Sequence, residues 1–179
     1  MKNIIENLIN LQQQINQELS LLATEQLQYK INTKTWSIAE ILAHIIVVNE
    51  SYYPTFQALQ DGKHQKPWLG KFGFWVSFLG KLILKAVEPQ RIKKIKTFKI
   101  WEPENFKIDQ NILTKFNNHQ QELIGKIKLL TQQVDLKTVI ASPANANIIY
   151  RLETALNIIV AHEQRHWNQI KEILTFINK

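Results

Sequence analysis

The sequence contains no cysteine, which excludes disulfides, thiolate metal ligands and a cysteine nucleophile. Any thiol that takes part in the chemistry of this protein must therefore come from another molecule. Glycine and proline are also scarce, with 5 of each in 179 residues. Because the turns between strands depend on these two residue types, their scarcity favours helices over a β-fold.

The sequence also lacks the apolar runs of targeting and membrane-spanning segments. The stretch Met1–Gln14 interleaves Glu, Asn and Gln with aliphatic residues, unlike the continuous apolar run of a signal peptide. The most apolar stretch, Trp68–Val87, contains three lysines, which is typical of an amphipathic helix and not of a transmembrane one. We therefore expect a cytoplasmic protein. The net charge of +7 indicates a lysine-rich solvated surface, and no nucleic-acid-binding motif accompanies it.

Apolar residues recur at spacings of three and four along four segments, which is the period of amphipathic helices. The first predicted helix covers about residues 3–27. The second begins at Ser37, which forms a capping box with Glu40, and Pro54 is expected to kink or break it. The third begins at Asp109 as a predicted N-cap, and the fourth covers about residues 149–177 after a connection at residues 142–147.

These helices predict a single domain over residues 1–179 with an all-α fold. The expected architecture is an up-down four-helix bundle with an extra helical excursion between the second and third helices. Within the excursion, residues 66–99 combine five aromatic side chains, from Trp68 to Phe78, with five basic residues among Arg91–Lys99. We expect this segment to fold over the bundle as a lid, and the alternative interpretation is peripheral contact with a membrane surface.

Two histidines stand out because they continue the buried stripe of the last predicted helix. His162 and His166 are four residues apart and therefore lie on one helix face. Burying two unpaired imidazoles costs free energy, and one divalent metal ion bound by both would remove that cost. Such a site usually takes a third protein ligand. His44 and His119 both fall at inward-facing positions of their helices, and the spacing alone does not choose between them.

Residues 162–166 also match the H-E-x-x-H pattern of zinc proteases, in which the glutamate, here Glu163, is a general base. A zinc protease takes its third ligand downstream, but only 13 residues follow His166. The extended form of that motif needs glycine and histidine where this chain has Gln169 and Glu172. A zinc protease is therefore a remote alternative, and we expect both Glu163 and Arg165 to form ion pairs that face solvent.

Two blocks of the sequence resemble a known family. Residues 36–45, WSIAEILAHI, resemble the W-S-x-x-E-x-L-x-H-L stretch of the DinB-like superfamily. Residues 162–170, HEQRHWNQI, resemble its H-x-x-R-H-x-x-Q-I ending. The order and distance of the blocks match, and the superfamily includes YfiT-type metal-dependent hydrolases and bacillithiol transferases. The resemblance implies a metal site formed by His44, His162 and His166, with His119, Glu163 and Arg165 as candidates for lining the pocket.

The resemblance further implies a divalent metal cofactor, with nickel or zinc favoured over iron or manganese. The expected function is a metal-dependent enzyme, either a hydrolase or a transferase of a small thiol, which acts on a small-molecule substrate. A bound metal lowers the pKa of water or a thiol toward neutrality and thereby creates the nucleophile. The alternative is a metal-binding, stress-associated protein without turnover. We expect no nucleic-acid partner, and homodimers are common among such bundles.

Overall fold

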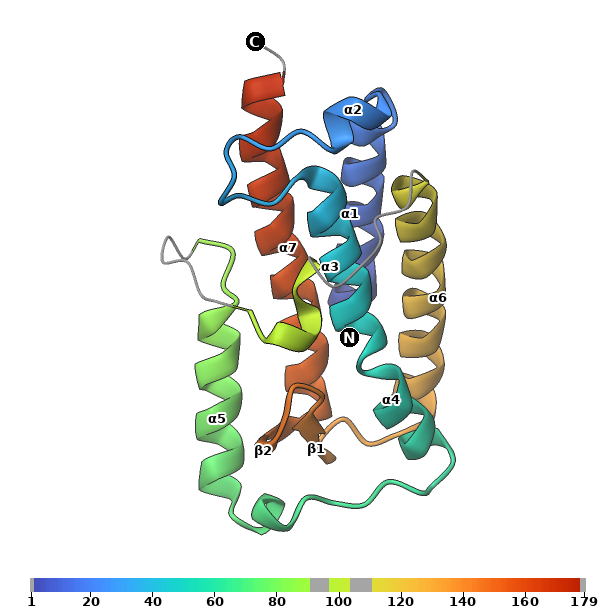
Figure 1. Ribbon diagram of the computed structural model, residues 1–179. Coiled ribbons are helices and arrows are strands. Elements are labelled where there is room, and N and C mark those ends of the chain that lie inside the picture. The colour runs from blue at the N-terminus through green and yellow to red at the C-terminus, as the bar shows by residue number, and fades with distance from the viewer. Residues whose placement is uncertain (1, 91–96, 104–110, 178–179) are drawn as a thin grey trace.

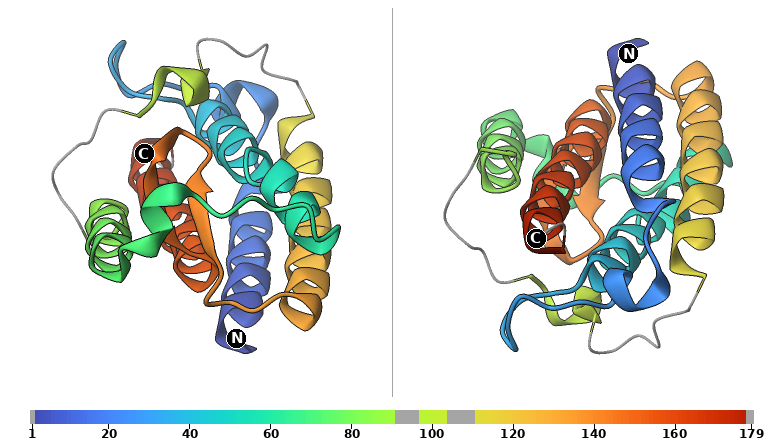
Figure 2. Two further views of the ribbon diagram at one scale, coloured as in Figure 1. Left: turned by 90° about the horizontal axis from the view of Figure 1, so that it is seen from below. Right: turned by 90° about the horizontal axis from the view of Figure 1, so that it is seen from above.

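The fold was analysed in a computed structural model, which describes residues 2–90, 97–103 and 111–177. Most of these residues are helical, and a two-stranded sheet accompanies the helices. None of the described helices is both long and apolar enough to cross a membrane. The long helices are α1 (Lys2–Leu19), α3 (Ile38–Glu50), α6 (Ile112–Gln133) and α7 (Leu152–Ile177). These four pack against one another, with α1 and α3 each in contact with both α6 and α7 (Figures 1 and 2).

The directions of the long helices differ from the alternating up-down course that we expected. A side-chain contact joins Asn49, one residue before the end of α3, to His119 in α6, and a second joins Gln60, farther along the chain, to Gln133 at the end of α6. The two segments therefore run parallel, while α1 and α7 run the opposite way (Figure 1). The excursion explains the difference, because it carries the chain back to the end of the molecule where α3 began before α6 starts.

The first predicted helix is shorter than expected. It ends at Leu19, and a separate turn of helix, α2 (Thr24–Leu27), follows after residues 20–23. Leu22, in the connection between the two helices, packs partly buried against the core. The predicted start of the third helix at Asp109 lies outside the described residues, and α6 has Asn111 as its N-cap.

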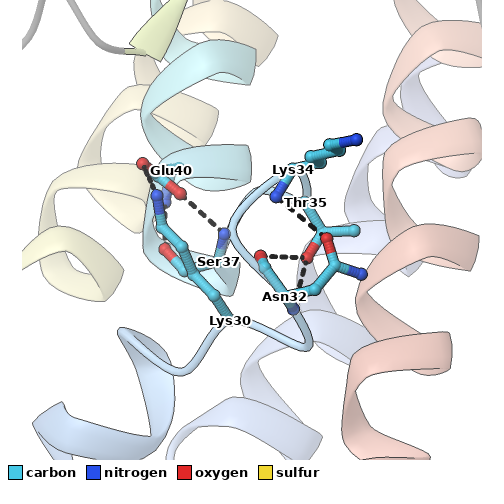
Figure 3. A network of polar contacts seen from close by, with 6 residues as sticks. All are labelled: Lys30, Asn32, Lys34, Thr35, Ser37 and Glu40. Carbon is cyan, nitrogen blue, oxygen red and sulfur yellow. Dashed lines mark hydrogen bonds and ion pairs between the residues drawn. The ribbon is translucent and has the colours of Figure 1, made fainter.

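The capping box at the start of α3 is confirmed (Figure 3). The Ser37 hydroxyl accepts a hydrogen bond from the Glu40 amide at 3.2 Å, and the Glu40 carboxylate accepts one from the Ser37 amide at 2.7 Å. Lys30 pairs with the same carboxylate at 2.6 Å. The predicted break also occurs, since α3 ends at Glu50 and α4 (Tyr53–Gln60) follows with Pro54 in its first turn. These signals fix where His44 lies, two turns into a buried helix.

The expected connection at residues 142–147 is instead part of a β-hairpin, so the all-α prediction is wrong in this region. Strand β1 (Val139–Ser142) pairs antiparallel with β2 (Asn145–Arg151), and α7 begins only at Leu152. The buried run Ile148–Tyr150 suits either element, because a short apolar run carries no clear period. Pairing with β1 decides the outcome in favour of a strand.

The excursion consists of the 3-10 turn η1 (Trp68–Lys71), helix α5 (Gly73–Ala86) and the 3-10 turn η2 (Lys99–Trp101). Helix α5 stands outside the four long helices, beside α7 and the hairpin (Figure 2). Gly80 permits this packing, because a Cβ atom there would lie 3.2 Å from side-chain atoms of both Tyr150 and Thr154. Most of the basic stretch Arg91–Lys99 lies outside the described residues.

The buried side chains form two apolar clusters with a polar layer between them. On α3 and just after its end the order is Ile45, Asn49 and Tyr52, so a buried amide separates a residue of one cluster from a residue of the other. The same alternation occurs on α6 and α7. The buried polar residues of this layer are His44, Asn49, His119, Gln120, Glu163 and His166. Buried polar groups cost free energy unless they are satisfied by partners. A whole layer of them therefore indicates a role other than packing.

Candidate metal centre

Three imidazoles from two antiparallel helices converge at one end of the polar layer. The Nε2 atom of His162 lies 3.2 Å from Nε2 of His44 and 3.0 Å from Nε2 of His166. The three candidate ligand atoms all lie within 4.8 Å of one another. His44 and His166 are buried, and His162 is partly exposed. The structure thus brings together the three histidines that the resemblance implied, and their arrangement could hold a metal ion.

Backbone and side-chain oxygens orient two of the three rings. Nδ1 of His44 lies 2.7 Å from the carbonyl oxygen of Trp101, and Nδ1 of His166 lies 2.7 Å from Oε1 of Gln169. Because these oxygens accept hydrogen bonds, each Nδ1 carries the proton, and each Nε2 presents its lone pair to the centre of the cluster. Metal-binding histidines commonly have such acceptors on the nitrogen that does not bind the metal.

Without a shared cation, the three Nε2 atoms would be poorly matched. The Nε2 atoms of His44 and His166 present lone pairs. A neutral His162 could carry one proton on its Nε2, and that single proton cannot fully satisfy both lone pairs. The buried Nδ1 atom of His162 has no hydrogen-bond partner among the described residues whether or not Nε2 binds a metal, so it does not distinguish the metal-bound cluster from the metal-free one. Zinc–nitrogen distances of about 2.0–2.1 Å in a tetrahedral site place the nitrogens about 3.3 Å apart. The residues present therefore fit a divalent metal.

Burial keeps the imidazoles neutral, which is the form that binds metals. It lowers the pKa of His44 from 6.5 to about 4, although the hydrogen bond to Trp101 acts in the opposite direction. Burial, with His44 as a further cause, lowers the pKa of His166 to about 3. The pKa of His162 also lies well below its usual value, through burial and then the neighbouring imidazoles. A metal ion would therefore meet little competition from protons at neutral pH.

We expect the metal-free protein to lose stability as the pH falls from 7 to 5. The pKa values of His44, His162, His166 and also His119 are lowered in the fold, so near pH 5 only the unfolded chain takes up these protons, which favours unfolding. Glu163 acts in the opposite sense, because burial raises its pKa to about 7 and the fold takes up its proton first. The effect of the four histidines exceeds that of the one buried glutamate. At about 1.4 kcal/mol per proton and pH unit, the free energy of unfolding should fall by several kcal/mol.

Urea unfolding at pH 7 and pH 5, in the presence of a chelator, measures this loss as a lower denaturation midpoint. An equal or higher midpoint at pH 5 would contradict it. Metal-loaded protein provides the control, because bound metal excludes protons from the three ligand rings and should reduce the decline.

Two tryptophans contact the histidine cluster, and only one of them, Trp36, belongs to a motif block of the sequence. The ring of Trp36 lies 4.9 Å from that of His44 and stacks at 6.3 Å, with an interplanar angle of 19°, on that of His166. Trp101 contributes its carbonyl oxygen to His44 from the turn η2, which belongs to the excursion. The position of Trp36 next to the capping box was a usable signal. Nothing in the sequence pattern pointed to Trp101, because its backbone oxygen is the group that matters.

Glu163 does not face solvent, contrary to our expectation. Its side chain is 0% exposed, and its Oε1 atom accepts hydrogen bonds from Asn49 Nδ2 at 2.7 Å and from Gln120 Nε2 at 2.9 Å. Residues 162 and 163 are neighbours on a helix and so point about 100° apart, which aims Glu163 at the interface with α3 and α6. The helical spacing of the sequence could have indicated that Glu163 would be buried, since it falls four residues after the buried Ile159.

The other pocket candidates take separate positions. His119 is buried, but it contacts the Asn49 amide at 3.2 Å and the Tyr53 hydroxyl at 3.3 Å and is not part of the cluster. Asn49 in turn donates a hydrogen bond to Glu163, the residue that follows His162. Arg165 is partly buried, and its guanidinium donates to the carbonyl oxygens of Ala86 and Glu88 at 3.4 Å. It thereby joins α7 to the end of α5.

Comparisons with known proteins agree with the resemblance of the two blocks. The family model described as the DinB superfamily matches residues 8–170. No curated protein and no solved structure matches this sequence. The matched residues span α1 to α7 and contain all three histidines of the cluster, as well as both motif blocks. This chain belongs to the DinB superfamily.

Proposed function

We propose that this protein is a metal-dependent enzyme in which His44, His162 and His166 bind a divalent ion and a small molecule supplies the substrate. The observation that carries the proposal is the convergence of three neutral imidazoles: Nε2 of His162 lies 3.2 and 3.0 Å from the other two Nε2 atoms, and the three ligand atoms all lie within 4.8 Å of one another. Imidazole ligands suit nickel and zinc, which we take as the favoured ions over iron and manganese. Sites with three protein ligands and an open position are typical of catalytic metals, whereas structural sites are closed by four.

The ligand set determines the charge of such a centre. Among the described residues the cluster consists of histidines alone, so it adds no negative charge to the ion. A divalent ion bound there would keep its full charge and lower the pKa of a bound water or thiol toward neutrality. The chain itself has no cysteine, so a thiol nucleophile would have to be a cosubstrate. Both a hydrolase and a thiol transferase are compatible with this chemistry.

The surroundings of the cluster favour a small substrate with an apolar part. His162 is the only member of the three-histidine cluster whose residue is not fully buried, although its Nδ1 atom is buried. Trp36 lies against the other two rings and offers a flat apolar surface beside them. The excursion contributes Trp101, whose carbonyl oxygen contacts His44. A residue from outside the four long helices therefore also borders the histidine cluster.

Turnover assays with the metal-loaded protein test this proposal. Nickel- and zinc-loaded samples are incubated with small thiols plus an electrophile, and separately with amide and ester substrates. We expect turnover in one of these arms, and we expect it to disappear after chelation and in the variant His44→Ala. His64→Ala is the matched control, because His64 contacts the Val139 carbonyl away from the cluster. Tight metal binding without turnover in either arm would contradict an enzyme and favour a non-catalytic metal-binding protein.

A further inference from the structure

The outer side of the excursion carries a large apolar surface that the metal site does not use. We call it the aromatic face. Its six side chains are between 48% and 75% exposed: Trp68, Phe72, Phe74, Trp75, Phe78 and Leu82. They form a continuous surface, since Phe74 stacks on Phe78 at 6.1 Å and Trp75 packs edge-on against both rings at about 6 Å. An exposed apolar surface of this size on a soluble domain usually marks an interaction site.

Packing among the described residues does not explain this exposure. Helix α5 already buries its opposite side, where Val76 and Gly80 face the hairpin and α7. Burial on that side is sufficient to hold the helix, so the fold does not require aromatic residues on the outer side. We expected residues 66–99 to cover the bundle as a lid, but the aromatic side chains of this segment are exposed. The contact with His44 comes from Trp101, which follows the segment.

The segment that carries the aromatic face has charges of one sign. Residues 62–87 contain five lysines and no aspartate or glutamate. Lys71 and Lys81 are exposed next to the aromatic side chains. Aromatic rings that lie beside lysines, with no acidic residues between them, are typical of helices that rest in the interface of an anionic membrane. Lysine side chains reach the phosphate level while the rings enter the acyl boundary.

A second copy of this chain fits the aromatic face less well than an anionic membrane does. In a symmetric contact the face would meet itself, so lysines would lie against lysines with no acidic residue from this segment to compensate.

Helix α5 has 14 residues, and at 1.5 Å per residue it is about 21 Å long, shorter than the ~30 Å hydrocarbon core. The helix can therefore lie in the plane of a membrane surface but cannot cross it.

We infer that the aromatic face docks the protein on membranes that contain anionic lipid. The inference does not depend on the metal or on turnover. Full-length protein is mixed with vesicles of phosphatidylcholine alone, or with vesicles in which part of that lipid is replaced by phosphatidylglycerol, and bound protein is measured by co-sedimentation. We expect binding to the anionic vesicles only, and we expect it to weaken as the salt concentration rises.

Matched variants assign the binding to this face. Phe74→Ser/Phe78→Ser should reduce binding by at least about tenfold, because both rings leave the apolar region. Leu129→Ser is the apolar control, since Leu129 on α6 has the same 48% exposure as Phe78. Lys81→Ala should reduce binding about fivefold, as about 1 kcal/mol per lysine implies. Lys128→Ala removes an exposed lysine from α6 as the charge control.

Several outcomes would overturn the inference. These are no binding to anionic vesicles, equal binding to both vesicle types, or an effect of Leu129→Ser as large as that of the double variant. Sedimentation equilibrium without vesicles provides a further test. A dimer that Phe74→Ser/Phe78→Ser dissociates would assign the face to a second copy and contradict membrane docking. Because the substituted side chains are exposed, thermal unfolding should be unchanged in every variant, which separates lost binding from lost folding.

Discussion

Replacement of His162 by alanine is expected to reduce the affinity for nickel or zinc by more than about 100-fold. Removing an outer acceptor of a metal-binding histidine costs about 10- to 100-fold, and loss of the ligand itself should cost more. His162 is the member of the cluster whose Nε2 atom lies within 3.2 Å of both other Nε2 atoms. Elemental analysis of untagged protein and titration calorimetry measure the effect.

Two further variants make this test specific. Gln169→Ala removes the oxygen 2.7 Å from Nδ1 of His166 and should give the intermediate loss of about 10- to 100-fold. His119→Ala is the control, because it removes a buried histidine that lies outside the cluster. An unchanged metal content in His162→Ala, or an equal loss in His119→Ala, would contradict the assignment of the ligands.

The same variants should separate metal binding from folding. Metal at about 1,000 times its dissociation constant stabilises a protein by about 4 kcal/mol, so the wild-type unfolding temperature should rise with metal. His162→Ala should not respond. In the absence of metal this variant should be at least as stable as the wild type, because it relieves the crowding of three nitrogen acceptors and the orphaned Nδ1 atom. A strongly destabilised metal-free variant would instead assign the cluster a structural role.

Replacement of Glu163 by alanine should destabilise the protein by about 3–5 kcal/mol. The substitution leaves two amide donors, Asn49 Nδ2 and Gln120 Nε2, without an acceptor inside the protein, and it opens a cavity in the polar layer. If the glutamate faced solvent, as the sequence suggested, the cost would stay within about 0.5 kcal/mol. Urea unfolding of metal-free protein at pH 7 distinguishes the two cases.

Glu163→Gln is the conservative partner of that variant. Its amide oxygen can accept from the same two donors, and its nitrogen takes the place of Oε2, which has no partner among the described residues. We expect it to cost less than about 1 kcal/mol near neutral pH. Because burial raises the pKa of Glu163 from 4.5 to about 7, this side chain makes the wild type lose stability as the pH rises from 4.5 to about 7, whereas Glu163→Gln lacks this pH-dependent loss. If Glu163→Ala and Glu163→Gln lost the same amount of stability, the hydrogen bonds to Glu163 would not be the cause of the loss.

Local patterns determined much of this fold and of its candidate site. The Ser37–Glu40 capping box and Pro54 act through neighbouring residues, so the limits of α3 could be predicted from the sequence. The four-residue spacing of His162 and His166 follows from the helical period alone. The family resemblance supplied His44, and the geometry of the three rings is consistent with it.

Where partners come from distant parts of the chain, the sequence was not sufficient. The run Ile148–Tyr150 forms a strand because β1 pairs with it, and Glu163 is buried because α3 and α6 supply its two amide donors. Likewise, Nδ1 of His44 is oriented by the Trp101 carbonyl, 57 residues away. The helical period places a side chain on a face, but only the packing of helices decides what that face meets. The sequence by itself therefore determined which residues could bind a metal, and the tertiary structure decided how they converge and which polar groups support them.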